Sequence, residues 1–160
     1  MKRIFVCSPL RGDGSIEARI ANQQRAAGYC RAVLSVGYIP VAGHLFYPQF
    51  LDDADPDERA MGIALGQFDM ASCHELWHWG DADWSTGMRG DIRTARRYGL
   101  GIFDGIERIE ERRAEIASLN ATILLEGDRP FHLDPARVRI SHLAARKIRN
   151  AYPLRASSSR

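Results

Sequence analysis

The sequence has little lysine and almost no net charge. Of its 22 basic residues, only Lys2 and Lys147 are lysine, and the rest are arginine. The 20 acidic residues bring the net charge to +2, so overall charge gives no reason to expect a nucleic-acid partner. Arginine's planar guanidinium suits phosphate and carboxylate, but a bias in genomic base composition accounts for the same excess. Both interpretations of the arginine content stay open.

Cysteines are few and apolar runs are short. Cys7, Cys30 and Cys73 are odd in number, widely spaced and without a C-x-x-C pair, which excludes a disulfide framework and a zinc knuckle. No apolar stretch approaches the ~20 residues of a membrane helix, and no signal-peptide core follows Lys2 and Arg3. We therefore expect reduced thiols, no membrane partner and a cytoplasmic location.

The 160 residues are enough for one domain with a core of its own. Hydrophobic residues make up 45% and charged residues 26%, as in ordinary globular proteins. We expect one domain over residues 1–151, with its core at 3–103 and a helical part at 105–151. Residues 152–160, rich in serine, are expected to form a flexible tail.

Apolar patterning and turn residues predict strands that alternate with helices. The predicted strands span 2–8, 38–42, 75–79 and 100–103, the predicted helices span 15–36, 56–72, 85–98, 105–119 and 135–151, residues 44–55 are an irregular loop, and 122–125 are a candidate last strand. This alternation indicates an α/β fold, a mostly parallel sheet with helices on both faces. The loops after Ser8, Ala42 and Trp79 then open at one edge, where such folds bind ligands.

Residues His74 to His78 (HELWH) match the H-E-x-x-H signature of zinc proteases. That chemistry needs a helix, because only there do residues i and i+4 bring two imidazoles to one metal. The segment is rich in strand formers, and on a strand the two positions lie roughly 13 Å apart. A zinc hydrolase is therefore a third hypothesis, and no metal site is expected.

Two separate segments carry a different chemistry. Residues 5–14 (FVCSPLRGDG) end a strand with a hydroxyl, a guanidinium and glycines whose amides can approach a ligand closely. Residues 85–92 (STGMRGDI) begin a helix, where Ser85 can act as N-cap and free amides beside Gly87 and Met88 favour an anion. Asp91 follows one to two turns into the helix, where its carboxylate can reach over such a pocket.

Over residues 3–103 these segments resemble the nucleoside 2-deoxyribosyltransferase superfamily. Residues 7–12 (CSPLRG) and the pattern Ser85-x-Gly87-x-x-x-Asp91 are most similar to its 2'-deoxynucleoside 5'-phosphate N-hydrolases and pyrimidine-nucleotide glycosidases. The stretch from Pro40 to Met88 also resembles uncharacterised phage and bacterial relatives. A serine at position 85 suits a phosphate acceptor, because a second carboxylate would repel the phosphate.

The resemblance implies a single Rossmann-like domain that forms a homodimer or a larger homo-oligomer. It implies cleavage of the base–sugar bond of a nucleoside 5'-monophosphate, by hydrolysis or base transfer, without metal or organic cofactor. Asp91 occupies the position of the family's nucleophilic glutamate, and its oxygens fall back by roughly 1.5 Å because aspartate is one methylene shorter. The predicted substrate-binding residues are Ser8, Arg11, Gly12, His44, Ser85, Gly87 and Met88.

Some residues keep two interpretations. His44 either contacts a base or phosphate of the ligand or has a structural role. The charged residues of the following segment either hold a nucleobase or order the loop; they are Asp52, Asp53, Arg59 and Asp69. From Ala136 onward the chain has seven basic residues and no acidic one, which fits a partner surface or a solvated helix. The alternative function is a nucleotide-binding module without turnover.

Overall fold

The computed structural model describes residues 1–80 and 85–125. The chain divides into two compact units, Met1–Ser118 and Leu119–Arg160. The elements in chain order are β1 (Arg3–Cys7), α1 (Ile16–Ser35), β2 (Ile39–Val41), α2 (Gly43–Phe46), the 3-10 helix η1 (Tyr47–Gln49), α3 (Pro56–Met70), β3 (Glu75–His78), α4 (Thr86–Arg97), β4 (Gly101–Asp104) and α5 (Gly105–Leu125).

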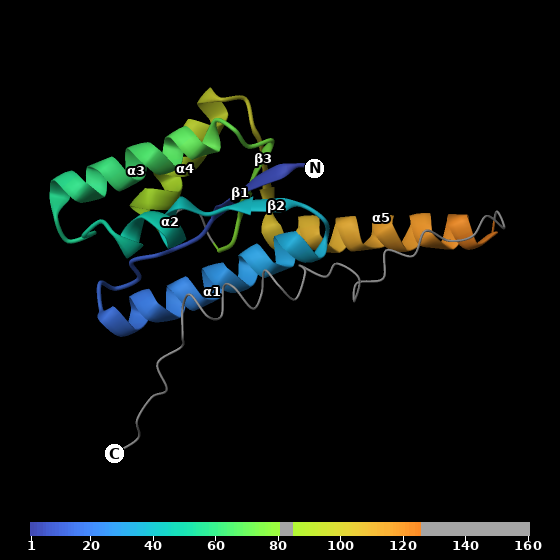
Figure 1. The fold of residues 1–160 in the computed structure, drawn as a ribbon, viewed down its shortest axis with the longest axis horizontal. Helices are drawn as coiled ribbons and strands as arrows, with labels where there is room; N and C mark the ends of the chain where they lie inside the picture. The colour runs from blue at the N-terminus through green and yellow to red at the C-terminus, as the bar shows by residue number, and fades with distance from the viewer. Residues whose placement is uncertain (81–84, 126–160) are drawn as a thin grey trace, which may run out of the picture. The chain divides into compact units, whose positions relative to one another are not determined.

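The four strands form one parallel sheet in the order β2-β1-β3-β4 (Figure 1). In the register, Val6 lies opposite Trp77, and Trp77 lies opposite Phe103. The predicted α/β class, with a Rossmann-like parallel sheet, is confirmed. After β2 the chain returns past β1 to form β3, so the strand order reverses between β1 and β3. Folds of this kind bind ligands at that reversal, beyond the carboxyl ends of the strands.

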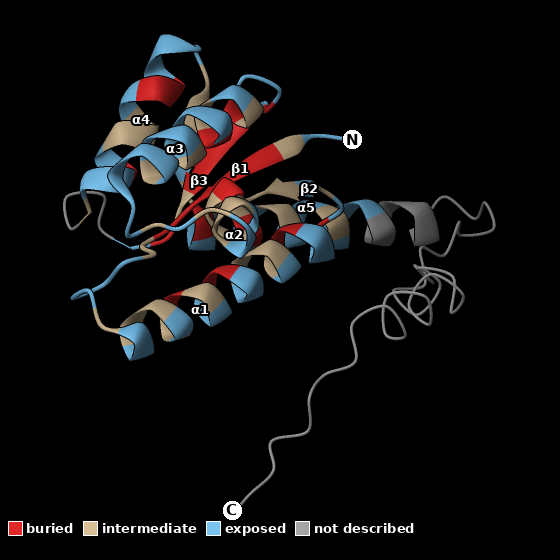
Figure 2. Ribbon diagram, turned by 60° about the vertical axis from the view of Figure 1, so that its left-hand side comes forward, coloured by how far each residue is buried: buried red, intermediate tan, exposed pale blue. Residues whose placement is uncertain are grey.

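Alternating side chains of the strands divide the interior into two clusters. Figure 2 shows that β1 and β3, at the centre of the sheet, are largely buried. One face of the sheet packs against α1 and α5, and its buried residues are Ile4, Val6, Val33, Val36, Trp77, Trp79 and Ile109. The other face packs against α3 and α4, and its buried residues are Phe5, Cys7, Met70, Cys73, Leu76, Met88 and Ala95. The helices therefore cover both faces of the sheet, as the sequence predicts.

Local capping explains where the helices begin. Ser15 accepts a hydrogen bond from the amide of Ala18 at the start of α1, and Asp55 caps α3 directly before Pro56. Helix α1 ends before Gly37, whose φ of +82° is a conformation that favours glycine. These starts and the end of α1 lie within one residue of the predicted bounds.

Two segments differ from the sequence-based expectation. The loop predicted at 44–55 contains α2 and η1, which are too short to show a helical period. The candidate strand at 122–125 is wrong, because those residues continue α5 to Leu125. A run as short as Thr-Ile-Leu-Leu shows no apolar periodicity from which a strand could be told from a helix. These residues are helical because α5 continues through them. The predicted helix at 135–151, the tail at 152–160 and the basic segment lie outside the described residues.

Within residues 1–80 and 85–125, every helix is too short or too polar to cross a lipid bilayer.

Glu75 joins three parts of the first unit through one buried carboxylate. The residue is 6% exposed and accepts hydrogen bonds from Lys2 at the N-terminus, from the indole of Trp77 (2.8 Å) and from Arg108 on α5 (3.3 Å). Burial acts to raise the pKa of Glu75, but these three donors outweigh it and hold the pKa below its ordinary value. The acidic residue of HELWH is therefore a structural group.

Replacing Glu75 by Gln is expected to lower the free energy of unfolding by about 1–3 kcal/mol at pH 7, because Lys2 and Arg108 lose a charged acceptor. Since the native pKa is lowered, this contribution is lost as pH falls through it, and wild type and variant converge in acid. Urea unfolding at pH 7 measures the loss of stability, and urea unfolding at pH 3 measures the convergence of wild type and variant.

The matched control is Glu111→Gln. Glu111 also binds Arg108, but its side chain is 57% exposed, so the expected change is under ~0.5 kcal/mol. Equal decreases in the free energy of unfolding for the two variants at pH 7 would contradict a larger contribution from the buried carboxylate.

Candidate functional site

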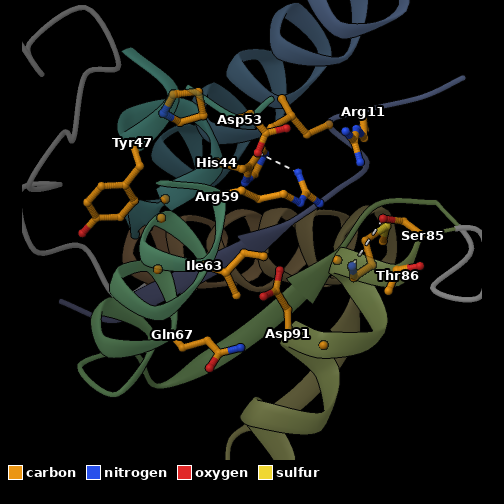
Figure 3. A pocket seen from close by; sticks show the side chains of 18 of the residues that line it. Arg11, His44, Tyr47, Asp53, Arg59, Ile63, Gln67, Ser85, Thr86 and Asp91 are labelled. Atoms are coloured by element: carbon orange, nitrogen blue, oxygen red, sulfur yellow. Dashed lines mark hydrogen bonds and ion pairs between the residues drawn. The ribbon is translucent and has the colours of Figure 1, made fainter. Parts of the chain in front are cut away.

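A cavity of about 410 Å³ opens at the carboxyl edge of the sheet, beside the reversal of strand order (Figure 3). Its wall includes Ser8 directly after β1, His44 in the helix after β2, and Ser85 before α4. Helices α3 and α4 supply two further sides of the wall. The size falls in the ~300–1,000 Å³ range of small-molecule sites.

The cavity brings together most of the predicted site residues. Lining it are Ser8, Arg11, His44, Ser85, Gly87, Met88 and Asp91. Gly12 is not part of the wall. It has a φ of +59°, and a Cβ there would lie 2.8 Å from Cβ of Ala18. The structure therefore gives Gly12 a packing role, in the turn that leads the chain from the cavity into α1.

Ser8 and His44 contact each other in the wall of this cavity. Ser8 Oγ lies 3.1 Å from His44 Nε2, and Ser8 is only 8% exposed. Burial lowers the pKa of His44 to about 4, so the imidazole is neutral at pH 7. A neutral imidazole can accept or donate a proton here, and it places no charge beside a bound ligand.

The N-terminus of α4 forms another part of the wall. Ser85 is the N-cap, and its hydroxyl accepts a hydrogen bond from the Met88 amide at 3.4 Å. Because the cap occupies that amide, and the Met88 side chain is 1% exposed in the core, Met88 holds the helix in place. In the part of the chain that the structure describes, the amides of Thr86 and Gly87 have no protein partner. They are the donors that the helix end offers an anion.

Asp91 extends from α4 into the cavity (Figure 3). The Cys7 thiol lies 3.9 Å from Asp91 Oδ2 and is its hydrogen-bond donor. Burial raises the pKa of the Asp91 carboxyl to about 7, and the bond from Cys7 offsets only part of that rise. The Cys7 thiol stays protonated, since burial and the nearby carboxylate raise its pKa well above the usual value. Perturbed carboxyls in clefts are characteristic of functional sites.

Arginine side chains occupy the mouth of the cavity. Arg11 is exposed, and its guanidinium has no protein partner among the described residues, so it is available to an anion. Arg59 of α3 pairs with Asp53 at 2.6 Å, and both residues line the wall (Figure 3). Of the four charged residues that the sequence left open in this segment, Asp53 and Arg59 therefore line the cavity.

The remaining acidic residues of this segment order the loop. Asp69 accepts a hydrogen bond from the Tyr47 hydroxyl at 2.7 Å, and Asp52 binds the amide of Ala54 at 2.9 Å. Neither carboxylate is part of the cavity wall. Their role is to hold η1 and the segment before α3 in place.

Sequence reasoning missed the α3 side of the cavity. Its main contributors are Tyr47, Leu51, Gly62, Ile63, Gly66 and Gln67. The glycines of this region were the available clue in the sequence, because glycine allows two helices to pack closely. A Cβ on Gly43 of α2 would lie 3.1 Å from the Cα of Gly66 on α3. Gln67 points toward Asp91 in Figure 3 and is the polar side chain that α3 presents there.

The HELWH segment has strand geometry over Glu75–His78. His74 Nδ1 accepts the Arg3 amide at 3.1 Å, and His78 Nδ1 lies 3.3 Å from the Gly80 carbonyl oxygen. The part of the chain that the structure describes holds no cluster of three His, Cys, Asp or Glu side chains suited to a metal. The helix that the zinc signature requires is not formed, so the zinc-hydrolase hypothesis fails on geometry.

A family model described as "Domain of unknown function (DUF7768)" matches residues 2–104, and the chain belongs to this family. No curated protein matches the sequence. The matched region runs from β1 to β4 and includes every residue that lines the cavity. The family description assigns no function.

Asp91→Asn is expected to stabilise the protein in a pH-dependent way. Because the folded pKa of about 7 lies above the ~3.9 of a free aspartate, ionisation opposes folding. The stability that wild type has below pH 4 is lost as pH rises through 7, whereas the amide never ionises. The variant should be more stable by ~1–4 kcal/mol at pH 8 and equal to wild type near pH 4.

Denaturant unfolding at pH 4 and pH 8 measures this difference. Glu110→Gln is the control, because Glu110 is an exposed carboxylate on α5 and should show no such gain at pH 8. A stability difference for Asp91→Asn that does not change with pH would contradict a desolvated carboxyl.

Proposed function

We propose that the protein is an N-glycosidase that cleaves the base–sugar bond of a nucleoside 5'-monophosphate, with Asp91 as the nucleophile. The observation that carries this proposal is a desolvated carboxyl in a cavity that also offers anion donors. Asp91, the first turn of α4 and Arg11 all line this one cavity. Its size suits a nucleotide, and the sequence resemblance described above points to the same chemistry.

The reaction follows the two-step logic of retaining glycosidases. An Asp91 carboxylate oxygen attacks the anomeric carbon, and the carbon–nitrogen bond to the base breaks. The electron pair leaves with the base, which takes a proton from solvent. The resulting ester between Asp91 and the sugar phosphate is then hydrolysed by water, or transferred to another base.

Phosphate binding is assigned to the polar end of the cavity. The amides of Thr86 and Gly87, which have no partner among the described residues, lie in the first turn of α4, where the macrodipole favours a negative charge. Arg11 lines the same cavity and adds an exposed guanidinium that can bind a phosphate in bidentate fashion. Burial favours the uncharged forms of Asp91 and His44, so they oppose an anionic substrate little.

The base is assigned to the side formed by α3 and η1. Ile63, Leu51 and Tyr47 provide apolar and aromatic surface there, which suits a planar base. Gln67 supplies an amide that can both donate and accept hydrogen bonds to the edge of that base.

A non-catalytic nucleotide-binding module is the second candidate. Two observations favour it: the Asp91 side chain is one methylene shorter than glutamate, and its pKa of about 7 leaves half of it protonated at neutral pH. Misplacement of a reacting group by ~1 Å can cost about 100-fold in rate.

Purified protein incubated with a panel of ribo- and deoxyribonucleoside 5'-monophosphates is expected to release free base, detected by chromatography. Asp91→Ala should abolish release, because removing a nucleophile costs several orders of magnitude. Glu110→Gln, far from the cavity in sequence and exposed, should leave it unchanged. No release together with a nucleotide-dependent rise in melting temperature would favour the binding module.

The rate is expected to rise with pH. A nucleophile must be ionised, so kcat/KM should increase up to about tenfold per pH unit below the Asp91 pKa of about 7 and level off above pH 8. Measurement from pH 6.5 to 9 stays above the second ionisation of the substrate phosphate near ~6. A rate that falls through pH 7 would instead assign Asp91 as a general acid.

A further inference from the structure

The contact between Ser8 and His44 has no role in the attack by Asp91. The two side chains come from different strand ends, 36 residues apart in sequence, and still meet with 3.1 Å between Oγ and Nε2. Both residues line the cavity that contains Asp91. When Nε2 is the unprotonated nitrogen of the neutral imidazole, as in the Nδ1–H tautomer, it accepts the hydrogen bond of the Ser8 hydroxyl and can take up its proton.

The second step of the proposed reaction needs such an acceptor. When water attacks the sugar–Asp91 ester, it must lose a proton, and retaining glycosidases use a second carboxylate for this. In the ester, Asp91 itself has no free charge. The other carboxylates of the wall are engaged, since Asp53 pairs with Arg59 at 2.6 Å and the exposed Glu58 binds the Asp52 amide.

His44 has the basicity that this step requires. Its pKa of about 4 keeps the imidazole neutral at pH 7, and it matches the ~3.9–4.3 of ordinary carboxylates, which act as general bases in glycosidases. Unlike a second carboxylate, the neutral imidazole does not repel the phosphate of the substrate. His44 therefore supplies a base without adding negative charge to the cavity.

The pair and the nucleophile line the same cavity. Cys7 contacts Asp91 Oδ2 through its thiol, and Ser8 is the next residue, with consecutive Cα atoms ~3.8 Å apart. The hydroxyl of Ser8 therefore lies one residue along the backbone from the side chain that holds Asp91.

We propose that Ser8 and His44 form the proton relay of the second step, an inference that rests on the proposed function. The water oxygen bonds to the anomeric carbon while the bond from that carbon to the Asp91 oxygen breaks. The electron pair returns to the Asp91 carboxylate. The proton of the water passes to Ser8 Oγ as the Ser8 proton passes to His44 Nε2, and the imidazolium then releases its proton to solvent.

The experiment measures base release by rapid mixing, with the nucleotide that wild type cleaves fastest. His44→Gln keeps a polar side chain but removes the base. It should release about one equivalent of base in the first turnover at near wild-type rate and then turn over ~10²-fold more slowly, because the ester accumulates. Mass spectrometry of the quenched protein should find the sugar phosphate on Asp91.

Azide separates a relay from a structural role. It carries no proton at neutral pH, so it attacks the ester without a base and should restore turnover in His44→Gln and Ser8→Ala, giving a glycosyl azide of retained configuration. The Ser8→Ala/His44→Gln double variant should be no slower than the slower single variant, since members of one relay act as a unit. His74→Gln is the matched control, because His74 is exposed and outside the cavity.

The outcomes separate the two proposals. No base release by wild type overturns the proposed function, and the relay with it. Base release that depends on Asp91 but shows no burst in His44→Gln, or no response to azide in a variant that melts like wild type, overturns the relay alone. A burst, azide rescue and an unchanged His74→Gln variant together support it.

Discussion

The reversal of strand order between β1 and β3 determines where every other feature of the site lies. All four strands run parallel, so the segments that follow β1, β2 and β3 open at one edge of the sheet. The chain covers one face with α1 before the reversal and the other face with α3 and α4 after it. Connections that diverge to opposite faces leave a crevice between them, and the cavity lies there.

Apolar packing then positions the one carboxylate of α4. Met88 and Ala95 are buried against Phe5 and Cys7 of β1, and they fix the rotation of the helix. Asp91 lies one turn after Met88 and one turn before Ala95, so the face that packs on the sheet also carries the carboxylate. The same packing brings Asp91 Oδ2 to the Cys7 thiol. A hydrophobic face therefore supplies both the stability of the helix and the desolvation of its polar group.

Desolvation acts on two kinds of titratable group in opposite directions. It raises the pKa of the acid Asp91 to about 7 and lowers the pKa of the base His44 to about 4, because burial penalises the charged form of each. Burial therefore limits the charge on both groups, while the exposed Arg11 adds a positive charge to the cavity wall. Carboxyl and imidazole groups with separated pKa values are a common basis for dividing acid and base roles in one site.

The sequence by itself determined the parallel α/β fold, the N-cap Ser85 and the edge of the sheet where the loops after the strands meet. Capping and periodicity depend on residues three or four positions apart, so they can be read locally. Only the tertiary structure decided that Ser8 meets His44, that Gly12 packs on α1 and that the Met88 amide belongs to the cap. The α3 wall of the cavity was likewise decided by packing. Contacts between residues tens of positions apart depend on strand order and helix rotation, which the whole core sets together.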